Sequence, residues 1–188
     1  MSQKLLLAMI SAAALLLLLT GCISVESKEY RFKVNPDGTG SGTITFVNIV
    51  SQDDEGRDVS FKDFGELVTD YMEGADFEDQ NPQYHITGKR LFQKDSLLMG
   101  EVTFTFTSFD SIGFFRQPDC DCCPVLLHSE AFQETYVESN GAYLGENAAT
   151  PFIRWTADTK EYYIKTRIMD DMTGTRSLLA HWQGWKKG

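Results

Sequence analysis

The sequence predicts an α+β domain built mainly on an antiparallel sheet, with one helix packed on a face of the sheet and a short helix at the carboxyl terminus. Runs in which apolar and polar residues alternate recur along the chain and are separated by turn sequences, as in β-hairpins. Only one long segment has the spacing of an amphipathic helix. The chain has 188 residues, of which 42% are hydrophobic, and includes 13 Phe and 7 Tyr. This composition is sufficient for the core of one globular domain.

The first hairpin is predicted around residues 30–47. Tyr30, Phe32 and Val34 alternate with charged residues, and residues 43–47 repeat the alternation after the turn sequence of residues 35–42. Pro and Gly in that turn supply the backbone angles that a tight connection needs. Its three glycines lead into a strand rather than a helix, which disfavours a phosphate-binding loop.

The helix is predicted to begin at Ser60, which would act as the N-cap, and to end at Gly74. Between them, apolar residues recur every three or four positions and form a stripe that can pack on the sheet. The acidic segments on either side, residues 52–58 and 73–79, are predicted to be solvated loops. The first of these lacks the ligand spacing of a calcium-binding hand.

A second hairpin is predicted from residues 84–92 and 98–109. In the latter strand Val102, Phe104 and Phe106 face one side, and polar residues face the other. Farther on, residues 133–138 and 142–144 are expected to pair around a tight turn at Asn140 and Gly141. Another strand pair is expected from residues 152–155 and 162–168.

The carboxyl-terminal segment, residues 177–188, places Leu178, Leu179, Trp182 and Trp185 at helical spacing, followed by Lys186 and Lys187. A short helix docked on the domain's own core is the favoured interpretation, since Gly184 weakens an independent helix. The alternative is contact with a membrane interface through Trp182 and Trp185, because aromatic side chains with basic neighbours suit that environment.

The amino-terminal segment has the pattern of a bacterial secretion signal. Lys4 precedes an apolar run at residues 5–19 that only Ser11 interrupts, and Leu19-Thr20-Gly21-Cys22 follows. The run is shorter than the ~20 residues of a spanning helix. Its ending resembles the lipobox of bacterial lipoproteins. That resemblance implies cleavage after residue 21 and lipid such as palmitate on Cys22. Residues 22–27 would then be a membrane tether, and the length of the rest of the chain predicts a single α+β domain at residues 28–188.

The same resemblance implies a location on the extracytoplasmic side of a bacterial membrane. Ile23 stands where an aspartate usually marks retention in the inner membrane, so the outer membrane is expected if the source has one. The net charge of −10 argues against nucleic acid as a partner. In the order of its elements, the segment from residue 28 to 109 loosely resembles uncharacterised bacterial lipoprotein domains. No functional residue follows from that likeness.

One dense set of reactive side chains is present: Cys120, Cys122 and Cys123, with His128 nearby. Thiolate and imidazole ligands suit zinc or copper. Outside the cytoplasm a local disulfide competes with a metal site and is favoured here, and the third thiol would then be free or would pair with another chain. The acidic residues within and beside the cluster oppose the low thiol pKa that redox catalysis requires.

No catalytic motif is found, and the three histidines are far apart in the sequence. The first hypothesis is therefore a non-enzymatic, lipid-anchored cell-envelope protein that interacts with a protein partner or serves as a scaffold. The alternative is an extracytoplasmic module that binds or senses metal through the segment from Cys120 to Cys123. An extracytoplasmic hydrolase with residues assembled from distant segments is the third hypothesis and has no specific support.

Overall fold

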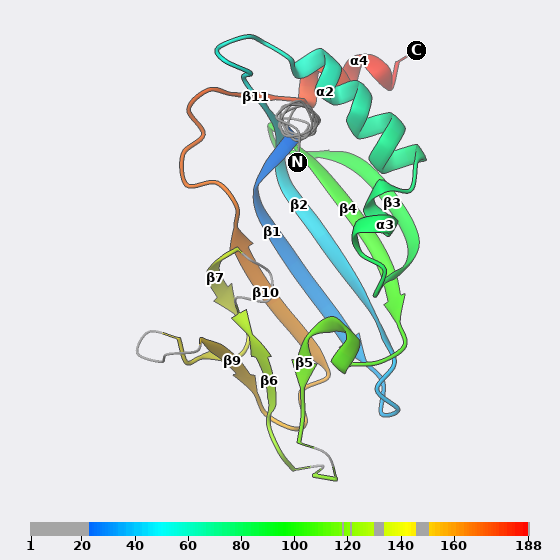
Figure 1. The fold of residues 1–188 in the computed structure, drawn as a ribbon, viewed down its shortest axis with the longest axis vertical. Helices are drawn as coiled ribbons and strands as arrows, with labels where there is room; N and C mark the ends of the chain where they lie inside the picture. The colour runs from blue at the N-terminus through cyan, green and yellow to red at the C-terminus, as the bar shows by residue number, and fades with distance from the viewer. Residues whose placement is uncertain (1–22, 118, 121, 130–133, 146–150, 188) are drawn as a thin grey trace, which may run out of the picture.

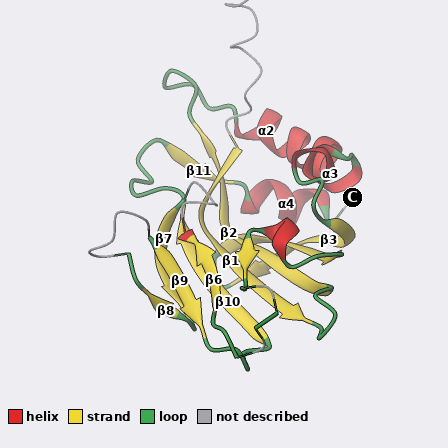
Figure 2. Ribbon diagram, turned by 60° about the horizontal axis from the view of Figure 1, so that its bottom comes forward, coloured by secondary structure: helices red, strands yellow, loops and turns green. Residues whose placement is uncertain are grey.

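The computed structural model describes residues 23–117, 119–120, 122–129, 134–145 and 151–187. Two antiparallel sheets form the body, and helices gather beside one end of the larger sheet (Figures 1 and 2). The prediction of an α+β fold with a mainly antiparallel sheet is confirmed. Within the described part of the chain, no helix is both long and apolar enough to cross a membrane.

The larger sheet has seven strands. They are β1 (Ile23–Val34), β2 (Gly40–Gln52), β3 (His85–Lys94), β4 (Leu97–Phe106), β7 (Thr135–Ser139), β10 (Glu161–Arg167) and β11 (Thr175–Ser177). The order is β3-β4-β2-β1-β10-β7, and β11 pairs with the end of β2. The two long hairpins predicted from alternation, β1–β2 and β3–β4, are both present.

The smaller sheet has four strands in the order β5-β6-β9-β8. They are β5 (Phe114–Phe115), β6 (Val125–His128), β8 (Ala142–Tyr143) and β9 (Phe152–Trp155). Phe114 and Trp155 of this sheet share one buried core with Phe32 and Phe104 of the larger sheet. The two sheets are therefore parts of one folding unit.

The helices within the described residues are α2 (Ser60–Glu66), the π-helix η2 (Leu67–Glu73), α3 (Asp76–Gln80), the 3₁₀ turn η3 (Asp110–Ile112) and α4 (Leu179–Trp185). The predicted helix is thus α2 continued by η2, and it ends at Gly74 as expected. Ser60 is not its N-cap. Val59 holds that position, and the Asp58 carboxylate accepts the Ser60 backbone N–H. The acidic segment predicted as a loop contains α3.

Two predicted hairpins are wrong. β7 pairs with β10 and β8 pairs with β9, so the chain passes from one sheet to the other at Asn140 and Gly141. β9 and β10 do not pair because they belong to different sheets. The Asn140 side chain holds this corner by accepting hydrogen bonds from the Trp155 indole and the Tyr163 backbone. Long-range bonds of this kind are not visible in a local turn sequence.

The tether expected at residues 22–27 is also corrected. β1 begins at Ile23, and Ile23 pairs with Ser51 of β2. Val25 and Ser27 are buried. Because β2 is long enough to pair with these residues, they continue the strand instead of forming a linker. Cys22 itself, with the whole predicted signal segment, lies outside the described residues.

A second core lies at the beginning of β1, where the helices pack on the sheet. Val25 and Ile49 of the sheet meet Phe64 and Leu67 of the helical segment, and Leu178 and Trp182 complete the cluster. The carboxyl-terminal helix α4 is therefore docked on the domain, as the favoured interpretation of the sequence predicts.

Candidate functional site: a pocket and a cysteine loop

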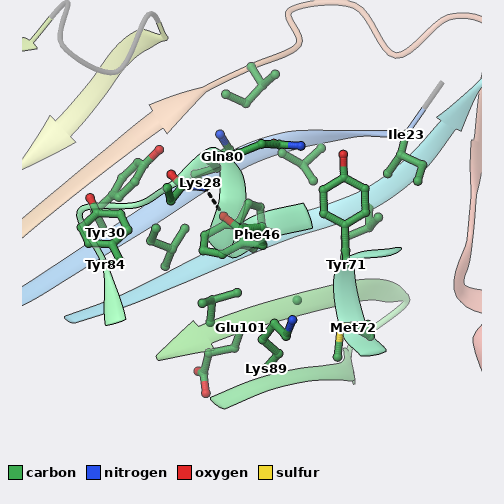
Figure 3. A pocket seen from close by; sticks show the side chains of 18 of the residues that line it. Ile23, Lys28, Tyr30, Phe46, Tyr71, Met72, Gln80, Tyr84, Lys89 and Glu101 are labelled. Carbon is green, nitrogen blue, oxygen red and sulfur yellow. Dashed lines mark hydrogen bonds between the residues drawn. The ribbon is translucent and has the colours of Figure 1, made fainter. Parts of the chain in front are cut away.

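A pocket of about 810 Å³ lies between the sheet and the helical segments. Its floor comes from β1, β2 and β4, and its wall from β3, η2 and the segment around α3 (Figure 3). The apolar side chains that line it include Ile23, Val25, Phe46, Tyr71, Met72 and Leu91. This size and this mixture of aliphatic and aromatic side chains are typical of small-molecule sites.

A charged pair sits in this apolar surface. Lys28 Nζ lies 2.6 Å from Glu134 Oε1, and the side chain of Glu134 is only 7% exposed. The Tyr30 hydroxyl, 3.0 Å away, and the Thr166 hydroxyl also donate to the Glu134 carboxylate. Burying a carboxylate is costly unless its charge is paired and its oxygens accept hydrogen bonds. Glu134 meets both conditions.

The electrostatics of the pocket keep Tyr30 and Tyr84 protonated. Burial, followed by the nearby charge of Glu134, raises the pKa of Tyr30 well above its usual value. Burial also raises the pKa of Tyr84. Both phenols are therefore neutral at physiological pH. The other polar groups that line the pocket include the Lys28–Glu134 pair and the amide side chains of Gln80, Asn81 and Gln83.

Two further ion pairs stand at the edge of the pocket. Lys89 binds Glu78 at 2.9 Å, and its hydrogen bond holds the pKa of Glu78 below the usual range. Arg90 binds Glu101 at 2.6 Å, which raises the pKa of the guanidinium. The cations around the pocket thus have acidic partners within the protein.

The cysteine loop lies far along the chain from these residues. Cys120 and Cys123 form a disulfide, and Cys122 is an exposed free thiol whose Sγ lies 3.6 Å from Cys120 Sγ. The local disulfide favoured from the sequence is present. The three sulfurs lie within 4.8 Å of one another, so together they could hold a metal ion.

His128 does not join that group among the described residues. It belongs to β6, and its ring packs edge-on against Phe152 at 5.2 Å. With Cys120 and Cys123 bonded to each other, Cys122 is the one thiol of the set that can ligate. A metal site would therefore require reduction of the disulfide.

The two tryptophans proposed for membrane contact have different environments. Trp182 is buried in the second core, whereas Trp185 is 52% exposed. Trp182 therefore cannot reach a membrane without undocking α4. Trp185 can, and Phe61 of α2, which is 81% exposed, lies at the same end of the molecule.

The structure also assembles a cluster of Asp58, Ser60 and His181 that sequence spacing does not predict. Ser60 Oγ donates to Asp58 at 2.7 Å and lies 3.0 Å from His181 Nε2. The bond from Ser60 holds the pKa of Asp58 below its ordinary value. The serine bonds to the acid directly, whereas in a nucleophilic triad the acid orients the histidine. The cluster therefore joins α2 to α4 and has no triad geometry.

Comparisons of the chain with protein-family models, with curated proteins and with solved structures found no match. The pocket was not predicted from the sequence, although one signal for it exists. Lys28 shares the inward side of β1 with Tyr30 and Phe32, so a charged residue continues an apolar face. Its partner, Glu134, is distant in the sequence.

Proposed function

We propose that the protein is a lipid-anchored bacterial cell-envelope protein that acts by binding and has no catalytic role. It is attached on the extracytoplasmic side through Cys22, in the outer membrane if the source has one. A protein partner in the envelope fits this role, and nucleic acid does not, because the chain is acidic.

The observation that carries the proposal is the arrangement around Ile23, the residue bonded to Cys22. Ile23 and Leu179 of α4 pack against the same core. The exposed aromatics Phe61 and Trp185 lie at this end, and Lys186 and Lys187 follow Trp185. Figure 1 shows the start of β1 beside α2 and α4. Exposed aromatic and basic side chains suit the membrane interface, and this end would face the bilayer if Cys22 carries the lipid.

Metabolic labelling with an alkyne fatty acid tests the attachment. We expect label on the wild-type chain and none on the Cys22→Ala variant. The Cys122→Ala variant is the matched control, because it removes an exposed cysteine outside the signal and should be labelled as strongly as the wild type. Equal labelling of all three proteins would contradict attachment at Cys22.

A second candidate function is metal binding or sensing at the cysteine loop, supported by the proximity of its three sulfurs. Zinc and copper are the metals that such thiolates prefer. In this candidate, reduction exposes the full ligand set. We expect the reduced protein to bind one zinc or copper ion, and the oxidised protein to bind neither. A reduced protein whose metal content does not change in the triple Cys→Ser variant would overturn this candidate.

A further inference from the structure

We propose that the pocket binds the long acyl chain of a membrane lipid and holds an uncharged ester or amide carbonyl of that lipid next to Lys28. The inference rests on the proposed membrane anchor, since the anchor would bring the pocket to its ligand.

The dimensions of the pocket suit an acyl chain. Its lining runs along β1 from Ile23 to Tyr30. Seven residue steps at ~3.3 Å give roughly 23 Å. An acyl chain spans one leaflet, about half of the ~30 Å hydrocarbon core, or roughly 15 Å. The volume of about 810 Å³ also lies within the range of roughly 300–1,000 Å³ for ligand sites.

The charges of the pocket argue for an uncharged polar group on the ligand. Lys28 is already neutralised by Glu134, so a ligand carboxylate would bring a second anion to a single ammonium. Among the described residues, Glu134 is the hydrogen-bond acceptor of Lys28. An ammonium has three donors, so a carbonyl oxygen can accept another one without adding charge.

The position of the pocket gives the ligand a route. Ile23 lines the pocket and is one Cα step, ~3.8 Å, from the cysteine that we propose is lipidated. One end of the apolar lining is therefore at the anchor. An acyl chain leaving the bilayer at that point would enter along Ile23, Val25 and Leu91 with little exposure to water.

The test is photolabelling of the full chain, purified from membranes into lipid nanodiscs, with a long-chain monoacylglycerol that carries a diazirine on its acyl chain. We expect crosslinks on peptides that contain Tyr71 or Leu91, both of which line the pocket. Unlabelled monoacylglycerol should compete at lower concentration than the corresponding free fatty acid. An apolar fluorescent dye, tested in parallel, reports whether the pocket binds apolar molecules in general.

Two double variants provide the comparison. Lys28→Met with Glu134→Gln removes the charged pair inside the pocket and keeps an amide oxygen for the hydroxyls of Tyr30 and Thr166. Lys33→Met with Glu161→Gln removes a solvent-exposed pair outside it. We expect the first to weaken monoacylglycerol binding by about tenfold to a hundredfold, the worth of one hydrogen bond to a charged group, and the second to leave binding unchanged.

Tighter competition by the free fatty acid would overturn the assignment of an uncharged carbonyl. If the dye binds and neither the monoacylglycerol nor the fatty acid competes with it, the proposal that the pocket binds an acyl chain is overturned. Equal monoacylglycerol affinity of the two double variants would overturn the role of Lys28. The mass of the amino-terminal peptide from the same sample reports whether Cys22 is acylated. Loss of the anchor and loss of the acyl ligand are therefore separate results.

Discussion

Lys28→Met is expected to destabilise the protein far more than removal of a surface lysine. The variant leaves Glu134, whose side chain is 7% exposed, without its cation. Breaking a buried ion pair in this way costs about 3–5 kcal/mol. Lys28 is itself 25% exposed, so solvent screens part of the attraction, and two hydroxyls still donate to the carboxylate. We therefore expect a loss of about 2–3 kcal/mol.

Urea unfolding followed by tryptophan fluorescence measures this loss. Lys33→Met is the control, because the Lys33–Glu161 pair is 72% and 69% exposed and should contribute at most ~1 kcal/mol. Adding Glu134→Gln to Lys28→Met should restore most of the stability, since no unpaired charge then remains buried. A Lys28→Met variant as stable as Lys33→Met would refute the buried-pair account of the pocket.

Three further predictions concern stability. Trp182→Ala should lower the free energy of unfolding by ~3–5 kcal/mol, as for other core aromatic residues, and Trp185→Ala should lower it by less than ~1 kcal/mol. Similar losses for the two variants in chemical unfolding would show that α4 is not docked. Gly141→Ala should cost ~1–3 kcal/mol, because its Cβ would lie 2.6 Å from the Trp155 ring, and a thermal melt like that of the wild type would contradict this. Burial raises the pKa of Tyr30, and it raises the pKa of Tyr163 to about 12. Each phenol therefore stabilises the folded state fully at pH values below the unfolded pKa of ~10, and this contribution is lost as pH rises through the folded pKa. Tyr30→Phe should flatten this alkaline loss, as measured by urea unfolding between pH 8 and 11; an unchanged slope would refute it.

The parts of the fold that the sequence predicts are those fixed by local patterns. The alternation of Tyr30, Phe32 and Val34 marks an inward face: Tyr30 and Phe32 are buried, and Val34 is partly buried against the same core. The apolar stripe of α2 and η2 and the stop at Gly74 are likewise local features. Hydrophobic periodicity and turn residues indicate which residues form a helix or a strand, because both depend on neighbours in the chain.

Pairings between sheets were not predictable in this way. Asn140-Gly141 has the sequence of a tight hairpin turn, yet it joins two sheets because Asn140 bonds to Trp155 and Tyr163. The sequence predicts a tether at the start of β1, because nothing local shows that β2 extends to pair with Ile23. Partners fixed by tertiary packing override a local signal.

The same difference between local and long-range contacts applies to the two candidate sites. The cysteine loop is compact in sequence, so its disulfide could be predicted from residue type and spacing. The pocket depends on Glu134 meeting Lys28 from 106 positions away, and on helices that fold back over the sheet. The position of Lys28 on an apolar strand face indicates that this residue is unusual, but it does not predict that Glu134 is its partner or that a pocket lies there.

The measurement that tests the proposed function most directly is the mass of the amino-terminal peptide of the protein isolated from its native membrane. The account predicts that the mature chain begins at Cys22 and that this residue carries acyl groups. A chain that still begins before residue 22, or that begins at an unmodified Cys22, would contradict the lipid anchor, and with it the membrane route proposed for the ligand of the pocket.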